Sequence, residues 1–176
     1  MRPVTPSSDH AAPSLLRYAP AFVLLAIAIA DAGRVADTDL WGHIAFGRLF
    51  PTAGPMIRDP FNYSAPGHLW NEHEWFSEVL VALAYNACGA VGLKLLKLLC
   101  SAITVVMIAA AEAETGARIP IQFAVLMVSA FALVPQMQFR PQLFTFALLT
   151  TLIAMLARGN YRRDARLWLV VPMFGL

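Results

Sequence analysis

The sequence predicts an all-α fold, a bundle of several transmembrane helices. Of its 176 residues, 59% are hydrophobic and only 14% are charged, and the mean hydropathy is +0.61. A soluble domain is about half apolar and a quarter charged, and one of this length could not bury so much apolar surface. The basic residues stand in short clusters between apolar runs, which is typical of loops at a membrane surface. We therefore expect a lipid bilayer as a partner, whereas the net charge of +2 does not indicate nucleic acid.

The N-terminal part predicts a lead-in followed by a first span. Residues 1–14 are rich in Pro, Ser and Ala, a composition typical of disorder. Residues 15–36 are long enough to cross a hydrocarbon core of about 30 Å at about 1.5 Å per residue. A cleaved signal peptide is the alternative, but Asp31 and Arg34 interrupt a small-residue cleavage site. We predict that residues 15–176 belong to one polytopic transmembrane domain.

The rest of the chain is apolar almost to its end. Its runs predict spans near residues 75–90, 91–111, 119–135 and 141–157, with another beginning at Leu167. That last run, LWLVVPMFGL, is too short to cross a membrane. We therefore expect a truncated chain, the N-terminal portion of a longer protein, which should be inactive when separated from the remainder.

Sidedness follows from the basic residues, because cytoplasmic loops contain more of them. If Lys94 and Lys97 lie on the cytoplasmic side, then residues 36–74, which precede them by one span, lie outside. We therefore predict that residues 36–74 form the first extracytoplasmic loop. Four full crossings after that loop would leave the arginines of residues 158–166 outside as well, so the number of crossings stays open. The predicted location is the inner (plasma) membrane of the cell, with several passes.

The two cysteines, Cys88 and Cys100, lie within apolar segments. A disulfide framework requires paired cysteines in exposed loops of an oxidising compartment. We expect both to be small buried hydrophobic side chains instead.

The first external loop begins with an amphipathic helix, DTDLWGHIAFGRLF, residues 37–50. Asp39 and His43, four residues apart, share one helical face. The apolar residues gather on another face: Leu40, Trp41, Ile44, Ala45 and Leu49. Such a helix is expected to lie in the membrane interface with Trp41 at headgroup depth. The four prolines and two glycines in the next segment, from Pro51 to Trp70, predict a loop.

Acids, imidazoles and tryptophans are unusually dense in this interval. They are Asp37, Asp39, His43, Asp59, His68, Trp70, Asn71, Glu72, His73, Glu74 and Trp75. Charged residues at membrane depth are costly and are usually kept for function. The alternative is a solvated loop in which Asp37 or Asp39 caps a helix and Glu72 or Glu74 stands in the first turn of the next one. The residue pattern alone leaves both interpretations open.

Three segments of the chain resemble a known enzyme family. They are DTDLWGHIAFGRLF, then GPMIRDPFNYSAPGHLWNEHEWFSEVLVALAY, then GAVGLKLLK, with FRPQLFTFALL further on. Together they are similar to the N-terminal part of bacterial polytopic glycosyltransferases of the C superfamily. The dolichyl-phosphate-mannose protein mannosyltransferase-like and lipid A aminoarabinose transferase-like groups belong to it. The resemblance covers about residues 36–157.

The resemblance implies transfer of a sugar from a polyprenyl-phosphate carrier to an acceptor, here unknown, at the extracytoplasmic face. The Asp37–Thr38–Asp39 segment is similar to the family's catalytic acid pair, although adjacent Asp-Glu is more usual there. A second family acid precedes the second span, and Glu72 or Glu74 matches it by position.

The chemistry agrees with these assignments. An acceptor hydroxyl that attacks the anomeric carbon needs a carboxylate to take its proton, and the departing phosphate needs a cation or a metal. Arg140 is the candidate cation, with an arginine that snorkels to the headgroups as the alternative. His43 and His73 are candidate substrate-binding residues. They could also hold a divalent metal, although a histidine beside a carboxylate is more often only hydrogen-bonded.

The predicted function is therefore a membrane enzyme, a glycosyltransferase that uses a lipid-phosphate-sugar donor. A non-catalytic multi-pass membrane protein, such as a transporter or an assembly subunit, is the alternative. A transporter should show internal repeats and polar residues within its helices, whereas here the polar groups gather in one loop. We expect Asp39, oriented by His43, to act as the base and Asp37 to act as a helix cap.

Overall fold

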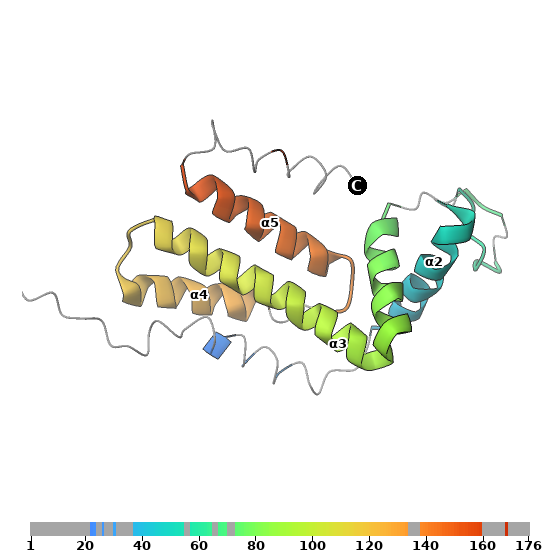
Figure 1. The fold of residues 1–176 in the computed structure, drawn as a ribbon, viewed down its shortest axis with the longest axis horizontal. Helices are drawn as coiled ribbons and strands as arrows, with labels where there is room; N and C mark the ends of the chain where they lie inside the picture. The colour runs from blue at the N-terminus through green and yellow to red at the C-terminus, as the bar shows by residue number, and fades with distance from the viewer. Residues whose placement is uncertain are drawn as a thin grey trace, which may run out of the picture.

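The computed structural model describes residues 22–23, 26, 30, 37–54, 57–64, 67–69, 73–133, 138–159 and 168. Within these ranges it has four helices: α2 (Leu40–Ala53), α3 (Trp75–Glu114), α4 (Ile119–Leu133) and α5 (Gln142–Ala157) (Figure 1). The prediction of an all-α fold is confirmed for this part of the chain. The lead-in over residues 1–14 lies outside the described residues, and so do most of the predicted first span and of the run that begins at Leu167.

Helix α3 has two arms joined by a sharp kink (Figure 1). The backbone leaves helical geometry at Cys88 and Gly89, where Gly89 has φ 56° and ψ −139°. A residue with a Cβ rarely adopts this conformation, so glycine suits the bend. We call residues 75–87 the first arm and residues 90–114 the second arm. The break lies beside the boundary predicted between the spans 75–90 and 91–111.

The two cysteines differ in their surroundings. Cys100 is buried, as expected, whereas Cys88 is exposed, and neither forms a disulfide. The expectation of burial is wrong for Cys88 because it stands at the kink, where the first arm turns away from the second.

Among the residues that the structure describes, α3 is the one helix long and apolar enough to cross a membrane. Helices α4 and α5 are also apolar, but with 15 and 16 residues they are shorter than the roughly 20 residues that a span needs. A helical chain with a candidate membrane span is thus what the structure supports. The number of crossings stays a prediction.

The second arm packs with α4 and α5 around an apolar core (Figure 1). Its buried members include Cys100, Val105, Leu126, Leu143 and Ala147. Large apolar side chains also point outwards from these helices: Leu95, Leu99, Val128, Phe131, Leu149 and Ile153. Helices that are apolar on their outer surface as well as in their core are typical of a lipid environment.

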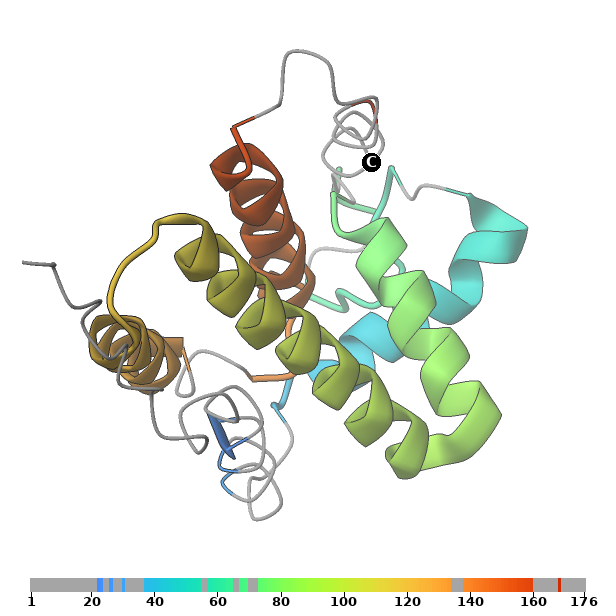
Figure 2. The ribbon, with the colours of Figure 1, turned by 60° about the vertical axis from the view of Figure 1, so that its left-hand side comes forward.

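Helix α2 packs against the first arm, as Figures 1 and 2 both show. The two run antiparallel, because Trp41 at the start of α2 contacts Tyr85, and Phe50 near its end stacks on Trp75. Gly47 lies between these contacts, so close to α3 that a Cβ there would stand 2.1 Å from the backbone oxygen of Glu78. The absence of a side chain at this position allows the two backbones to approach.

The face of α2 that was expected to meet lipid mostly packs against protein. Leu40 and Ile44 are buried together with Val81 and Leu93 of α3. Trp41 is largely exposed. The prediction of the helix itself is confirmed, whereas its position in a membrane interface stays a prediction.

Helix α2 also ends later than predicted. It continues through Pro51 to Ala53, where a loop was expected from Pro51. A proline near the end of a helix removes one backbone hydrogen bond, which the packing of α2 tolerates. Gly54, with φ 67°, then ends the helix, and its N–H donates to the oxygen of Phe50 at 2.8 Å. The loop that follows contains one antiparallel bridge between Arg58 and Leu69.

Candidate functional site

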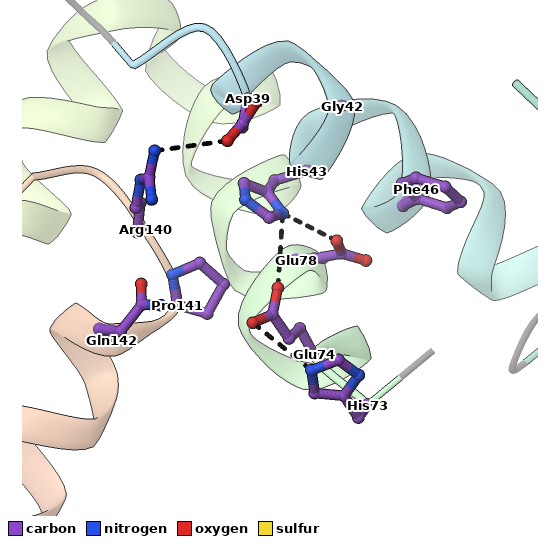
Figure 3. Close-up of a pocket in the computed structure, with 10 residues that line it drawn as sticks. All are labelled: Asp39, Gly42, His43, Phe46, His73, Glu74, Glu78, Arg140, Pro141 and Gln142. Atoms are coloured by element: carbon purple, nitrogen blue, oxygen red, sulfur yellow. Dashed lines mark hydrogen bonds and ion pairs between the residues drawn. The ribbon is translucent and has the colours of Figure 1, made fainter. Parts of the chain in front are cut away.

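The N-terminal ends of α2, α3 and α5 meet around one cavity of about 400 Å³ (Figure 3). Its lining residues are Asp39, Gly42, His43, Phe46, His73, Glu74, Glu78, Arg140, Pro141 and Gln142. Four of the residues singled out from the external loop therefore line the same cavity as Arg140. Arg140 therefore faces the same side as these residues, although about a hundred residues of sequence separate it from Asp37 and Asp39.

The two aspartates before α2 hold the arginine before α5. Arg140 Nε donates to Asp37 Oδ2, and its terminal NH₂ group stands 3.5 Å from Asp39 Oδ2. The hydrogen bond from Arg140 lowers the pKa of Asp37, and the same bond raises the pKa of Arg140. The Asp37 side chain is only 5% exposed, whereas that of Asp39 is 63% exposed. Asp37 is thus used in positioning Arg140, and Asp39 presents its carboxylate to the cavity.

Neither aspartate serves α2 as a side-chain cap. Asp39 occupies the N-cap position but makes no capping hydrogen bond with its side chain. Asp37 Oδ1 instead accepts from the backbone N–H of Asp39 at 3.1 Å, before the helix begins. The expected role of Asp37 as a cap is therefore wrong, because its carboxylate is held by Arg140.

His43 points from α2 to α3. Its Nδ1 lies 2.9 Å from Glu78 Oε1 and 4.0 Å from Glu74 Oε2 (Figure 3). The hydrogen bond with Glu78 raises the pKa of His43, against the opposing effect of burial. The expected orientation of Asp39 by His43 is wrong, since only the backbone N–H of His43 reaches Asp39, at its carbonyl oxygen. The shared helical face was read correctly, but packing against α3 turns the imidazole towards a closer carboxylate.

Sequence reasoning missed Glu78. This residue is 4% exposed and stands one helical turn after Glu74. A signal was present in EWFSE, because two carboxylates four residues apart on a helix repel each other by roughly 0.2–0.5 kcal/mol. Such a pair indicates a nearby positive partner, and the structure places His43 there.

The other predicted residues have more varied positions. His73 is largely exposed at the edge of the cavity, with Nε2 3.8 Å from Glu74 Oε1. Glu72 lies outside the described residues. Asp59 accepts a hydrogen bond from the backbone of Phe61 and shapes the loop rather than the cavity.

One group of side chains could hold a metal ion. The ligating atoms of His43, Glu74 and Glu78 all lie within 4.8 Å of one another. One imidazole and two carboxylates form a donor set that suits divalent transition metals.

Comparison with known proteins gave no match: no family model, no curated protein and no solved structure resembled the chain significantly. The family resemblance of the sequence segments thus stays a prediction. The case for a function depends on the residues of the cavity and on the helix that begins beside them.

Proposed function

We propose that this chain is part of a membrane glycosyltransferase that moves a sugar from a polyprenyl-phosphate carrier to an acceptor. The observation that supports the proposal most directly is the presence of Asp39 and Arg140 on one cavity. A general base for the acceptor and a cation for the phosphate are the two groups that this reaction needs. Asp39 and Arg140 are far apart in the sequence, so their proximity is a result of the fold and not of a shared loop.

The proposed step breaks one bond and forms another. The acceptor hydroxyl attacks the anomeric carbon while the Asp39 carboxylate takes the hydroxyl proton. The bond between that carbon and the phosphate oxygen breaks, and the phosphate leaves with the electron pair. The carboxylate of Asp39 suits the first task because it is exposed to the cavity.

Arg140 suits the second task. Its guanidinium has about five N–H donors, and its contacts with Asp37 and Asp39 use only part of them. The remaining donors can bind the oxygens of a phosphate, for which the planar guanidinium is well shaped. Asp37 acts as a positioning residue that fixes the direction of the guanidinium.

The position of the cavity beside α3 fits a lipid-linked substrate. Glu74 directly precedes α3, the candidate span, and Glu78 is in its first turn. We propose that the bilayer begins beside the cavity, where α5 starts at Gln142. The second arm of α3 and the other apolar helices then lie in it, and the protein resides in the plasma membrane. The cavity then lies at headgroup depth, where a polyprenyl phosphate presents its sugar.

The proposal can be tested in cells that lack the protein. Polyprenyl-phosphate-linked sugar should accumulate in their membrane lipid extracts, measured by mass spectrometry, and the native protein should remove the accumulation. Arg140→Gln should fail to do so. The matched control is Arg48→Gln, because Arg48 is an exposed arginine that contacts Asn86 and Tyr85 and does not line the cavity.

Two results would contradict the proposal. One is an unchanged pool of lipid-linked sugars in cells without the protein. The other is an Arg140→Gln variant that restores the pool as well as Arg48→Gln does while both accumulate in the membrane to the same level.

A further inference from the structure

The cavity has more negative than positive charge. Three carboxylates line it, those of Asp39, Glu74 and Glu78, whereas Arg140 supplies one positive charge and His43 is neutral when its Nδ1 binds an ion. Carboxylates that are partly removed from water need compensation by nearby cations. The remaining difference of two negative charges is what one divalent ion would neutralise.

Three of the side chains have a spacing that suits such an ion. In a tetrahedral zinc site the ligands lie about 2.0–2.2 Å from the metal and hence about 3.4 Å from each other. The distances from His43 Nδ1 to Glu78 Oε1 and to Glu74 Oε2 are 2.9 and 4.0 Å, on either side of this value. The carboxylate oxygens of Glu74 and Glu78 lie within 4.8 Å of each other. Side-chain rotations that bring this third distance to the tetrahedral value would place all three ligands around one ion.

The backbone holds these ligands on rigid elements. Glu74 and Glu78 lie at the start of α3, one turn apart. His43 is on α2, which Gly47 brings against the backbone of Glu78. A metal site on packed helices keeps its geometry better than one on a loop.

We propose that His43, Glu74 and Glu78 bind a divalent transition-metal ion, with zinc or manganese as the expected class. Three protein ligands leave a coordination position open, as in catalytic zinc sites, and here that position faces the cavity. The ion takes the place of the proton between Nδ1 of His43 and the Glu78 carboxylate. The imidazole disfavours calcium and magnesium, which prefer oxygen ligands throughout.

This site does not depend on sugar transfer, since metal binding is measured directly. The purified chain in detergent micelles, stripped with a chelator, is dialysed against Zn²⁺ and its metal content is measured by mass spectrometry. We expect one ion per chain. Competition with a chromophoric chelator gives the affinity, and Mg²⁺ in excess should not displace the bound Zn²⁺.

Variants separate this site from surface binding. Glu74→Gln and His43→Asn should each weaken Zn²⁺ binding at least about 10–100-fold, the range known for partners one shell further out. His68→Asn and Glu114→Gln are matched controls, an exposed histidine of the loop that does not line the cavity and an exposed carboxylate at the other end of α3, and both should bind like the native chain. Glu74 is partly exposed, so the Gln variant keeps the fold, which circular dichroism checks.

The proposal is overturned if the native chain binds less than one ion, or if Glu74→Gln binds Zn²⁺ as tightly as the native chain. It is also overturned if His68→Asn weakens binding as much as His43→Asn does, because the ligands would then lie elsewhere. Failure of the lipid-extract experiment leaves this result unaffected, since that experiment reports on sugar transfer and this one on ion binding.

Discussion

The two ends of α3 take part in very different kinds of packing. Around the first arm, α2 and the residues before α5 bring charged side chains together across long sequence distances. Around the second arm, α4 and α5 contribute mostly apolar side chains, both towards the core and outwards. We call these the site region and the apolar region.

The difference fits the proposal that one chain meets both water and lipid. The apolar region has many large exposed hydrophobic side chains, and Phe131 is 85% exposed, which is unfavourable in water and favourable in lipid. The packing of the site region instead brings charged side chains into pairs. The attraction within such pairs is stronger where water is partly excluded. The kink at Gly89 separates the two regions. In the proposed membrane position, the apolar region faces lipid and the site region faces water.

The largest expected effect concerns catalysis in the site region. Under the proposed function, Asp39→Asn should lower sugar transfer about 10²–10⁴-fold, the usual loss for a general base. Asp37→Asn should lower it less, because Asp37 acts through Arg140. Transfer rates in membranes with equal protein amounts provide the measurement. An inactive Asp37→Asn beside an active Asp39→Asn would move the base to Asp37.

The next effect tests the solvent of the apolar region. Val128 in α4 is 70% exposed, and Val128→Arg should reduce membrane integration, because arginine in the centre of a span costs about 2.5–3.5 kcal/mol. Tyr63→Arg is the control, since Tyr63 is 94% exposed in the loop between α2 and α3. The fraction of protein resistant to carbonate extraction is measured. Equal extraction of both variants would mean that α4 meets water.

A smaller effect tests how closely the site region is packed. Gly47→Ala places a Cβ against the backbone of Glu78 and should destabilise the chain by about 1–3 kcal/mol, the usual cost of overpacking. Gly42→Ala is matched to it on the same helix, with nothing within 4 Å of the new Cβ, and should be neutral or stabilising by up to about 1 kcal/mol. Thermal unfolding in detergent compares them. A Gly47→Ala variant as stable as Gly42→Ala would show that α2 and α3 separate easily.

The smallest effect is a dependence on pH in the metal-free chain. Glu78, Glu74 and Asp39 face His43, and the hydrogen bond that His43 donates to Glu78 raises the pKa of His43 above the ordinary 6.5. Protonated His43 therefore stabilises the fold fully below pH 6.5, and this contribution is lost as the pH rises through the raised pKa. The unfolding temperature should fall over that range, and His43→Asn should flatten the fall. An identical slope in both chains would assign the dependence to another group.

The sequence predicted the helices better than it predicted the contacts between them. Apolar runs identified α3, α4 and α5, and the boundary near residue 90 matched a real break, because hydrophobicity and glycine act locally. Asp39 and His43 do share a helical face, but their spacing could not reveal that Glu78 would compete for the imidazole. That outcome depends on the approach allowed by Gly47, which is a property of two helices together.

Arg140 illustrates the same limit from the other side. The chemistry of the proposed reaction suggested that Arg140 lies near Asp37 and Asp39. No local sequence pattern predicted this contact. The contact between Arg140 and Asp37 spans 103 positions of sequence, and it depends on how α3 and α5 pack together. Amino-acid composition alone does not determine that packing.

The bond between Asp37 and Arg140 also has a consequence in time. A ribosome adds about 5–20 residues per second, so the 103 positions between these residues correspond to roughly 5–20 s of synthesis. During that interval the two aspartates are already part of the nascent chain, but the arginine has not yet been added. Asp37 and Asp39 therefore have no Arg140 partner during this interval, and the cavity is completed only when the start of α5 has been synthesised.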